Sequence, residues 1–209
     1  MNTTEIHIIF PNQLFKNSEI LDPIENIILI EEYLFFNQYK FHKQKIAFHR
    51  ATMKAYEDYL SNKGKKVTYI NAKSEWSDIR KLLPKLAEEG TSKIHIIDPT
   101  DNWLEKHIHQ SKGALDINWY DNPLFINTKK ELSTFFKPTK KKFFQTSFYK
   151  TERKNRNILM DGKNPRGGQL TFDSENRKKY PKNKKPPPIQ FSKATKYHKD
   201  AVKYVNKDF

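Results

Sequence analysis

The sequence predicts an α/β domain in which helices cover both faces of a five-stranded parallel sheet, followed by a basic, partly helical C-terminal extension. Short β-rich runs alternate with segments of helical periodicity over residues 1–130, and these runs are almost continuously apolar. Hydrophobic residues make up 36% and aromatic residues 13% of the 209 residues, which is sufficient for one compact core. One domain with an appendage is therefore expected.

Five runs have the length and composition of single strands. In chain order they are Ile6–Phe10, Asn26–Ile30, Lys66–Ile70, Lys93–Ile97 and Asp116–Tyr120. Their apolar character is typical of a parallel sheet that is covered on both faces, because a sheet with one face in water alternates apolar and polar residues.

Apolar residues recur at helical spacing between these runs. A long helix that ends at Gly64 is predicted by Ile46, Met53, Tyr56 and Leu60. A second helix, irregular at Pro84 and ending near Gly90, is predicted by Trp76, Ile79, Leu83 and Leu86. A third helix, which begins at Asp101 and ends near Gly113, is predicted by Trp103, Leu104 and Ile108. No glycine lies in a strand-to-helix turn, and neither GxGxxG nor a P-loop pattern occurs. An ordinary NAD enzyme or P-loop ATPase is therefore disfavoured.

The C-terminal third has a different composition. Residues 1–136 carry 18 Lys and Arg against 18 Asp and Glu, whereas residues 137–209 carry 21 against 6, so the whole net charge of +15 lies there. A helix is expected over Phe143–Met160, then a glycine-rich polar run, then the lysine- and proline-rich segment Lys182–Pro188 as an extended spacer. Such a cationic extension is either a nucleic-acid-binding segment, with DNA as partner, or a solvated tail.

Several classes of site are excluded or disfavoured. The chain has no cysteine, which excludes disulfides, thiolate zinc sites, cysteine nucleophiles and an iron–sulfur cluster ligated by this chain. The seven histidines do not have metal-ligand spacing, so no metal site is expected. No apolar run approaches the roughly 20 residues that span a bilayer, so we expect no membrane contact and a cytoplasmic location. No nucleophile arrangement is visible, and no catalytic residue is assigned.

Ligands of doubly wound sheets bind beyond the carboxyl ends of the strands. Residues 11–15, 31–42, 98–101 and 120–123 occupy these positions. Glu31 and Glu32 follow the second strand, where adjacent side chains point to opposite faces, so a single binding or structural carboxylate is more plausible than a catalytic pair.

Aromatic and histidine side chains also gather near this edge. His42 and His49 share one face of the long helix at its N-terminal end, where they either face a ligand or help to pack the helix. The neighbouring aromatic residues are Tyr33, Phe35, Phe36, Tyr39 and Phe41. They can stack on a flat heterocycle or belong to the core.

Three stretches resemble one known family. They are Pro11–Leu14, Glu31–Arg50, and the stretch that begins at Phe148 and runs through Ile158–Met160 to Pro165–Lys178. In order and spacing they are similar to the deoxyribodipyrimidine photolyase-related family, which includes bacterial iron–sulfur cryptochromes and (6-4) photolyases. Members of this family act in light-dependent DNA repair or blue-light sensing. The resemblance extends along nearly the whole chain.

The resemblance implies a flavodoxin-like (Rossmann-like) antenna-type domain at residues 1–130, a connector with a helix and a glycine-rich loop at 131–181, and at 182–209 a tail that begins a missing helical domain. In the family, the antenna domain can hold 6,7-dimethyl-8-ribityllumazine, which passes excitation to FAD. FAD and the [4Fe-4S] cluster belong to the missing helical domain, so this chain alone is not expected to repair DNA. Three interpretations of the chain are compatible with this resemblance. It is a fragment, one half of a split protein with a separate helical FAD-binding subunit, or a stand-alone descendant.

The resemblance also implies a set of chromophore-binding residues. The family's pattern is matched at Gln13, Glu31, His42 and Lys45. It is not matched at Pro11-Asn12, where the family has Gly-Asp, or at Phe35, where some members have a glutamate that faces the lumazine. His49 occupies a helix position that lines the pocket in the family. Glu32 could supply the missing carboxylate. The candidate set is therefore Asn12, Gln13, Glu31, Glu32, Phe35, His42, Lys45 and His49.

Two other functions compete with this one: a nucleic-acid-associated binding module that uses the basic tail, and an independent α/β enzyme. If a helical domain is missing, aromatic residues of the connector should be more exposed than is usual for their type. The residues concerned are Phe143, Phe144, Phe148 and Phe172.

Overall fold

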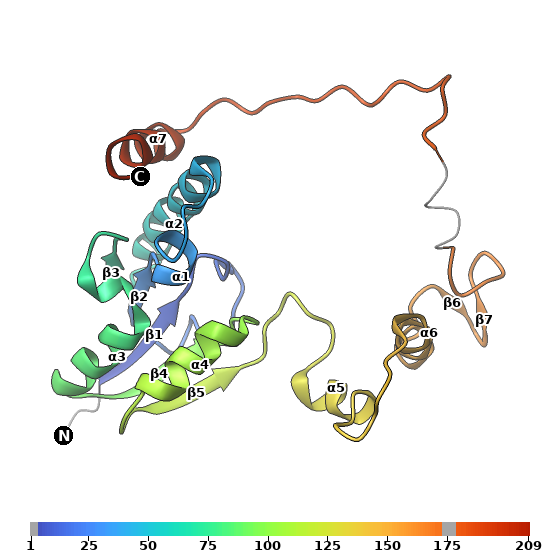
Figure 1. Cartoon of the computed structure of the whole chain (residues 1–209), viewed down its shortest axis with the longest axis horizontal. Helices are drawn as coiled ribbons and strands as arrows, with labels where there is room; N and C mark the ends of the chain where they lie inside the picture. Colours follow the sequence, from blue (N-terminus) through green and yellow to red (C-terminus); the bar gives the residue numbers. More distant parts are fainter. Residues whose placement is uncertain (1–3, 173–178) are drawn as a thin grey trace. The chain divides into compact units, whose positions relative to one another are not determined.

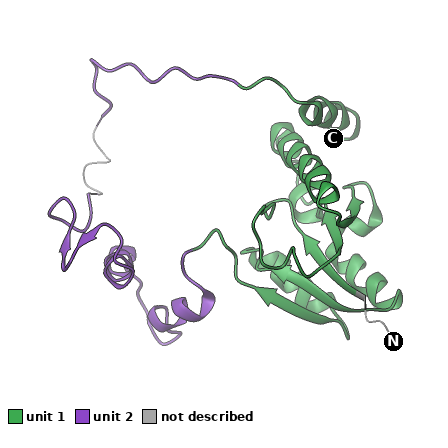
Figure 2. Ribbon diagram, turned by 180° about the vertical axis from the view of Figure 1, so that it is seen from behind, with its two compact units in different colours: residues 1–125, 192–209 green, residues 126–191 purple. Residues whose placement is uncertain are grey.

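The computed structural model describes residues 4–172 and 179–209, and the chain divides into two compact units. Unit 1 comprises residues 1–125 and 192–209, and unit 2 comprises residues 126–191 (Figure 2). This division differs from the expected segments, because the last part of the tail folds with the sheet. Residues 173–178, which carry part of the third family-like stretch, lie outside the described residues.

All five predicted strands form one parallel sheet in unit 1. They are β1 (Thr4–Ile9), β2 (Asn26–Ile30), β3 (Lys66–Ile70), β4 (Thr91–Ile97) and β5 (Asp116–Tyr120), in the order β3-β2-β1-β4-β5. The predicted α/β class is thus confirmed, and the order is that of the first five Rossmann strands rather than the flavodoxin order 2-1-3-4-5. The direction of winding reverses between β1 and β4, which places the ligand crevice beyond their carboxyl ends.

Helices cover the two faces of this sheet (Figure 1). The helical elements of unit 1 are α1 (Tyr33–Phe36), α2 (Lys43–Asn62), the 3₁₀ turn η1 (Glu75–Ser77), α3 (Ile79–Glu88), α4 (Asn102–Ser111) and α7 (Lys196–Asp208). On one face, α3 and α4 pack on Ile8, Ile94 and Ile96. On the other, α2 packs on Ile27 and Leu29. Among the described residues, no helix combines the length and the apolar character needed to cross a membrane.

Local chemistry explains where these helices begin and end. The His42 imidazole accepts the backbone N–H of Gln44 at 3.2 Å and caps α2, as its helix-opening position suggests. Gly64 follows α2 with φ of +79°, a conformation in which a side chain would be strained. The second predicted helix begins later than expected: Trp76 belongs to η1, because Asp78 caps α3 and starts it at Ile79.

Helix α7 is the main element that was not predicted from the sequence. Its side chains Ala201 and Val205 are buried, and Val205 joins the apolar cluster beneath α2. Near the start of α7, Lys196 and Tyr197 both contact the Asp58 carboxylate of α2, at 3.0 and 2.6 Å. The segment expected to lead into a missing domain therefore completes unit 1.

Unit 2 contains α5 (Lys129–Phe135), α6 (Gln145–Asn155) and a small hairpin of β6 (Met160–Asp161) and β7 (Asn164–Pro165). The helix predicted to reach Met160 ends earlier, because Asn157 and Leu159 adopt positive φ and the hairpin begins at Met160. The expected exposure is confirmed for Phe143 (50%), Phe144 (63%) and Phe172 (40%). Phe148 is half-buried against the rings of Phe135 and Phe136.

Candidate functional site

Two amide side chains bridge the carboxyl ends of β1 and β4, where ligands of doubly wound sheets bind. Gln13 is 1% exposed, and its Nε2 donates to the backbone oxygens of Ile97 (2.8 Å) and Asp98 (3.1 Å). Asn12 is exposed, and its Nδ2 approaches the Pro99 carbonyl at 3.5 Å. The buried Gln13 Oε1 has no hydrogen-bond partner in the described part of the chain. An acceptor is thus left over at the switch point, where ligands of this fold class bind.

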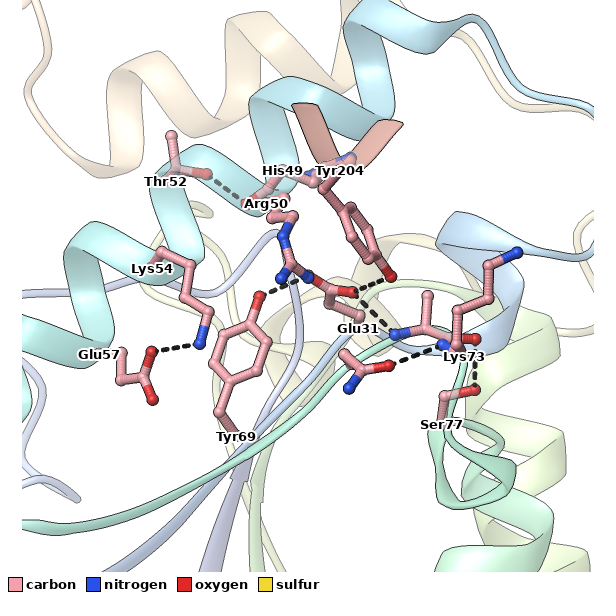
Figure 3. A network of polar contacts seen from close by, with 12 residues as sticks. Glu31, His49, Arg50, Thr52, Lys54, Glu57, Tyr69, Lys73, Ser77 and Tyr204 are labelled. Atoms are coloured by element: carbon pink, nitrogen blue, oxygen red, sulfur yellow. Dashed lines mark hydrogen bonds and ion pairs between the residues drawn. The ribbon is translucent and has the colours of Figure 1, made fainter. Parts of the chain in front are cut away.

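Glu31 lies fully buried at the centre of a polar network that joins α2, β3 and α7 (Figure 3). Its carboxylate accepts from Arg50 Nη1 (2.7 Å), the Tyr69 hydroxyl (2.5 Å), the Ala72 backbone N–H (2.8 Å) and the Tyr204 hydroxyl (3.2 Å). Four donors use the acceptor capacity of the two oxygens. The geometry therefore favours a structural role for Glu31.

Glu32 is also fully buried and caps two helices. Its carboxylate accepts the backbone N–H of Leu34 at the start of α1, and that of Ile79 at 3.3 Å at the start of α3. Burial raises the Glu32 pKa to about 7, and the nearby Asp78 carboxylate adds to this rise. Both carboxylates at the end of β2 are thus occupied by protein donors.

A half-buried imidazole and several aromatic rings gather near the N-terminal end of α2. The ring centroid of His49 lies 6.0 Å from those of Phe35 and Phe36 and 6.3 Å from that of Phe48. Burial lowers the His49 pKa, the Lys45 cation lowers it further, and a hydrogen bond with the Pro11 carbonyl opposes both effects. His49 is therefore a neutral imidazole at pH 7, with one ring nitrogen as donor and one as acceptor.

The structure separates the candidate residues into three groups. Asn12 and Gln13 belong to the loop after β1, His49 bonds to Pro11 of this loop, and Phe35 contacts the His49 ring. Glu31 and Glu32 lie beneath, occupied by protein donors. On the rim, His42 is an exposed cap and the Lys45 ammonium lies 3.6 Å from the Phe41 ring centroid. Burial lowers the Lys45 pKa.

Three residues of this region were not identified from the sequence: Arg50, Tyr69 and Tyr204, the partners of Glu31. The Arg50 guanidinium also lies 3.5 Å from the Tyr204 ring centroid. The spacing of Tyr197, Ala201, Tyr204 and Val205 is that of one helical face, so it was a signal for a packed C-terminal helix.

A parallel sheet in Rossmann order, with an aromatic and imidazole rim instead of a glycine-rich phosphate loop, defines a Rossmann-like α/β domain with a strand-end crevice. The family model described as "Deoxyribodipyrimidine photo-lyase-related protein" matches residues 7–209. The chain belongs to this family.

Two relatives show how the match is distributed. "Uncharacterized protein R852" of Acanthamoeba polyphaga mimivirus is 37% identical over 188 residues, covering 84% of this chain and 95% of that protein. A "(6-4) photolyase" of Agrobacterium fabrum is 24% identical over 186 residues, covering 83% of this chain. The match spans only 36% of the photolyase.

Proposed function

We propose that unit 1 is an antenna-type domain that holds a flat heterocyclic chromophore of the lumazine class in the crevice beside His49. The observation that carries this proposal is a neutral, half-buried imidazole with aromatic rings around it, which bonds to Pro11 of the loop that also carries Gln13 and its unpaired amide oxygen. Phe35 and Phe48 offer faces for stacking, and Phe48 is exposed. Lys45 supplies a cation for the oxygens of the heterocycle.

The proposal assigns different roles to the candidate residues from those the resemblance implies. Gln13 Oε1 would accept an N–H of the heterocycle, and Asn12 lies exposed at the mouth of the crevice. Glu31 and Glu32 would hold the surrounding helices without touching the chromophore, because their oxygens already accept protein donors. Excitation transfer to a flavin would require a second, FAD-binding partner.

Binding can be measured by titrating the full chain with 6,7-dimethyl-8-ribityllumazine and following its fluorescence. His49→Ala removes a ring contact and a hydrogen-bonding group, so we expect it to weaken binding about tenfold or more. His109→Ala is the matched control, because His109 is an exposed helical histidine whose ring centroid lies 5.3 Å from that of Trp119 of β5. Absence of saturable binding by the unmodified chain, or equal effects of the two substitutions, would contradict the proposal.

A second candidate function rests on unit 2. Residues 126–191 carry 18 Lys and Arg against 5 Asp and Glu. The exposed lysines 140–142 directly precede the exposed rings of Phe143 and Phe144. Cations beside exposed aromatic rings are typical of surfaces that bind single-stranded nucleic acid by phosphate contact and base stacking. We therefore also propose that unit 2 binds nucleic acid with little dependence on sequence.

Fluorescence anisotropy with a labelled single-stranded oligonucleotide at two salt concentrations tests this. Replacing lysines 140–142 by glutamine should weaken binding and reduce the slope of log K against log[salt] by about 0.7 for each lost phosphate contact. The matched control replaces Lys199, Lys203 and Lys207, three exposed lysines of α7, and so removes the same charge. If both variants lost affinity equally, only net charge would matter. If both variants kept the affinity of the unmodified chain, lysines 140–142 would not take part in binding.

A further inference from the structure

A second hollow lies away from the strand-end crevice, on the α3 face of the sheet. It is an open cavity of about 340 Å³ along β2 and β3, within the range of about 300–1,000 Å³ that is usual for small-ligand sites. Ile28, Ile70, Leu82 and Leu86 are among its apolar lining residues, and Trp76 of η1 provides an indole. None of the residues around the strand-end crevice lines it.

The cavity exists because the first part of the edge strand β3 is covered on one face only, whereas Ile70 at its end packs against the α3 side. Val67 and Tyr69 pack against the α2 side of the sheet, whereas Lys66 and Thr68, which alternate with them, are exposed. Parallel sheets normally have both faces covered. Here the α3 face of β3 carries a hollow in which apolar side chains of strands and helix remain accessible.

Two lysines at this cavity can bind an anion at small cost. Lys66 pairs with Glu25 at 3.5 Å, and Lys85 pairs with Glu89. Lys66, Glu25 and Glu89 have exposed side chains, and exposed ion pairs contribute little to stability, so an anionic ligand can exchange for the carboxylates. The Lys85 ammonium also lies 5.3 Å from the Trp76 ring centroid, so a charge and a flat apolar surface are presented together.

We propose that this cavity is a binding site for a small flat amphipathic anion, with its aromatic or alicyclic body on Trp76 and the leucines of α3 and its anionic group at Lys66 and Lys85. The site is independent of the chromophore site proposed above. Thr68, exposed on the edge strand, lies among the lining residues and gives access to the cavity by a surface substitution.

The test uses the full chain and 8-anilinonaphthalene-1-sulfonate, an aromatic anion with a flat naphthalene ring that fluoresces in apolar sites. We expect saturable binding at one site, weakened about tenfold by Thr68→Tyr, whose ring occupies the cavity. Asn118→Tyr places the same ring on an exposed position of the other edge strand, β5, and should leave the affinity unchanged. Equal binding by the two variants would overturn the proposal, and so would a loss caused by His49→Ala.

The charge and the indole are tested separately. Replacing Lys66 and Lys85 by glutamine should weaken binding of the sulfonate about fivefold, while binding of the uncharged N-phenyl-1-naphthylamine stays the same. Trp76→Phe should reduce energy transfer from tryptophan to the bound sulfonate much more than Trp103→Phe, at an exposed tryptophan of α4. Equal loss for the charged and uncharged probes, or equal energy transfer in the two tryptophan variants, would overturn the proposed binding mode.

Discussion

Replacing Glu31 by glutamine is expected to lower the free energy of unfolding by about 3–5 kcal/mol, because it breaks a buried ion pair. The Arg50 guanidinium would lose its counter-charge, and the new amide group would present hydrogens to two donors that now bond to the carboxylate. Urea denaturation followed by circular dichroism measures the loss. Hydrogen exchange should increase in α7, since Tyr204 is one of the four donors.

Glu57→Gln is the matched control for this prediction. Glu57 pairs with Lys54 at 2.7 Å on α2, but both side chains are partly exposed, so the loss should stay below about 1 kcal/mol. If Glu31→Gln were no more costly than Glu57→Gln, or if exchange in α7 did not change, Glu31 would not be the centre that joins α2, β3 and α7.

The second large effect concerns pH. The folded-state pKa of Glu32 is raised from 4.5 to about 7, so the folded protein retains a proton that the unfolded chain releases. The stabilisation that this gives is fully present below about pH 4.5 and is lost as the pH rises through about 7. We therefore expect the free energy of unfolding of the wild-type chain to fall by about 3 kcal/mol, relative to that of Glu32→Gln, as the pH rises through this range.

The comparison must be made as a difference between variants, because His7 acts in the opposite sense. Burial lowers the His7 pKa from 6.5 to about 4, so its contribution to stability falls as the pH drops through that interval. The two groups partly cancel in the wild-type curve, whereas subtraction of the Glu32→Gln curve isolates Glu32. Thermal or urea unfolding from acid to neutral pH gives both curves.

Glu88→Gln, at an exposed glutamate of α3, serves as the control and should run parallel to the wild-type curve. Parallel curves for Glu32→Gln and the wild type would contradict the raised pKa. A difference of opposite sign would show that the hydrogen bonds to Leu34 and Ile79 outweigh the burial of the charge.

The position of some candidate residues followed from the sequence, whereas their role in binding stays a prediction. Gln13 and His49 lie near the carboxyl ends of the strands because the order of strands and helices along the chain determines which loops meet there. The burial of Glu31 and Glu32 was not predictable, because the sequence gives the end of β2 but not the donors that converge on it. Arg50 is close to Glu31 in sequence, but Tyr204 is separated from it by most of the chain.

The five strands, the long helix α2, the lack of a phosphate-binding loop and the concentration of positive charge after residue 136 follow from the sequence alone, because periodicity and composition are local properties. Three features became visible only in the fold: α7 packs on α2, both glutamates after β2 accept hydrogen bonds from protein donors, and a cavity lies open beside β3. These features depend on contacts between distant segments, whose free energy comes from burial and hydrogen bonding that no local pattern records.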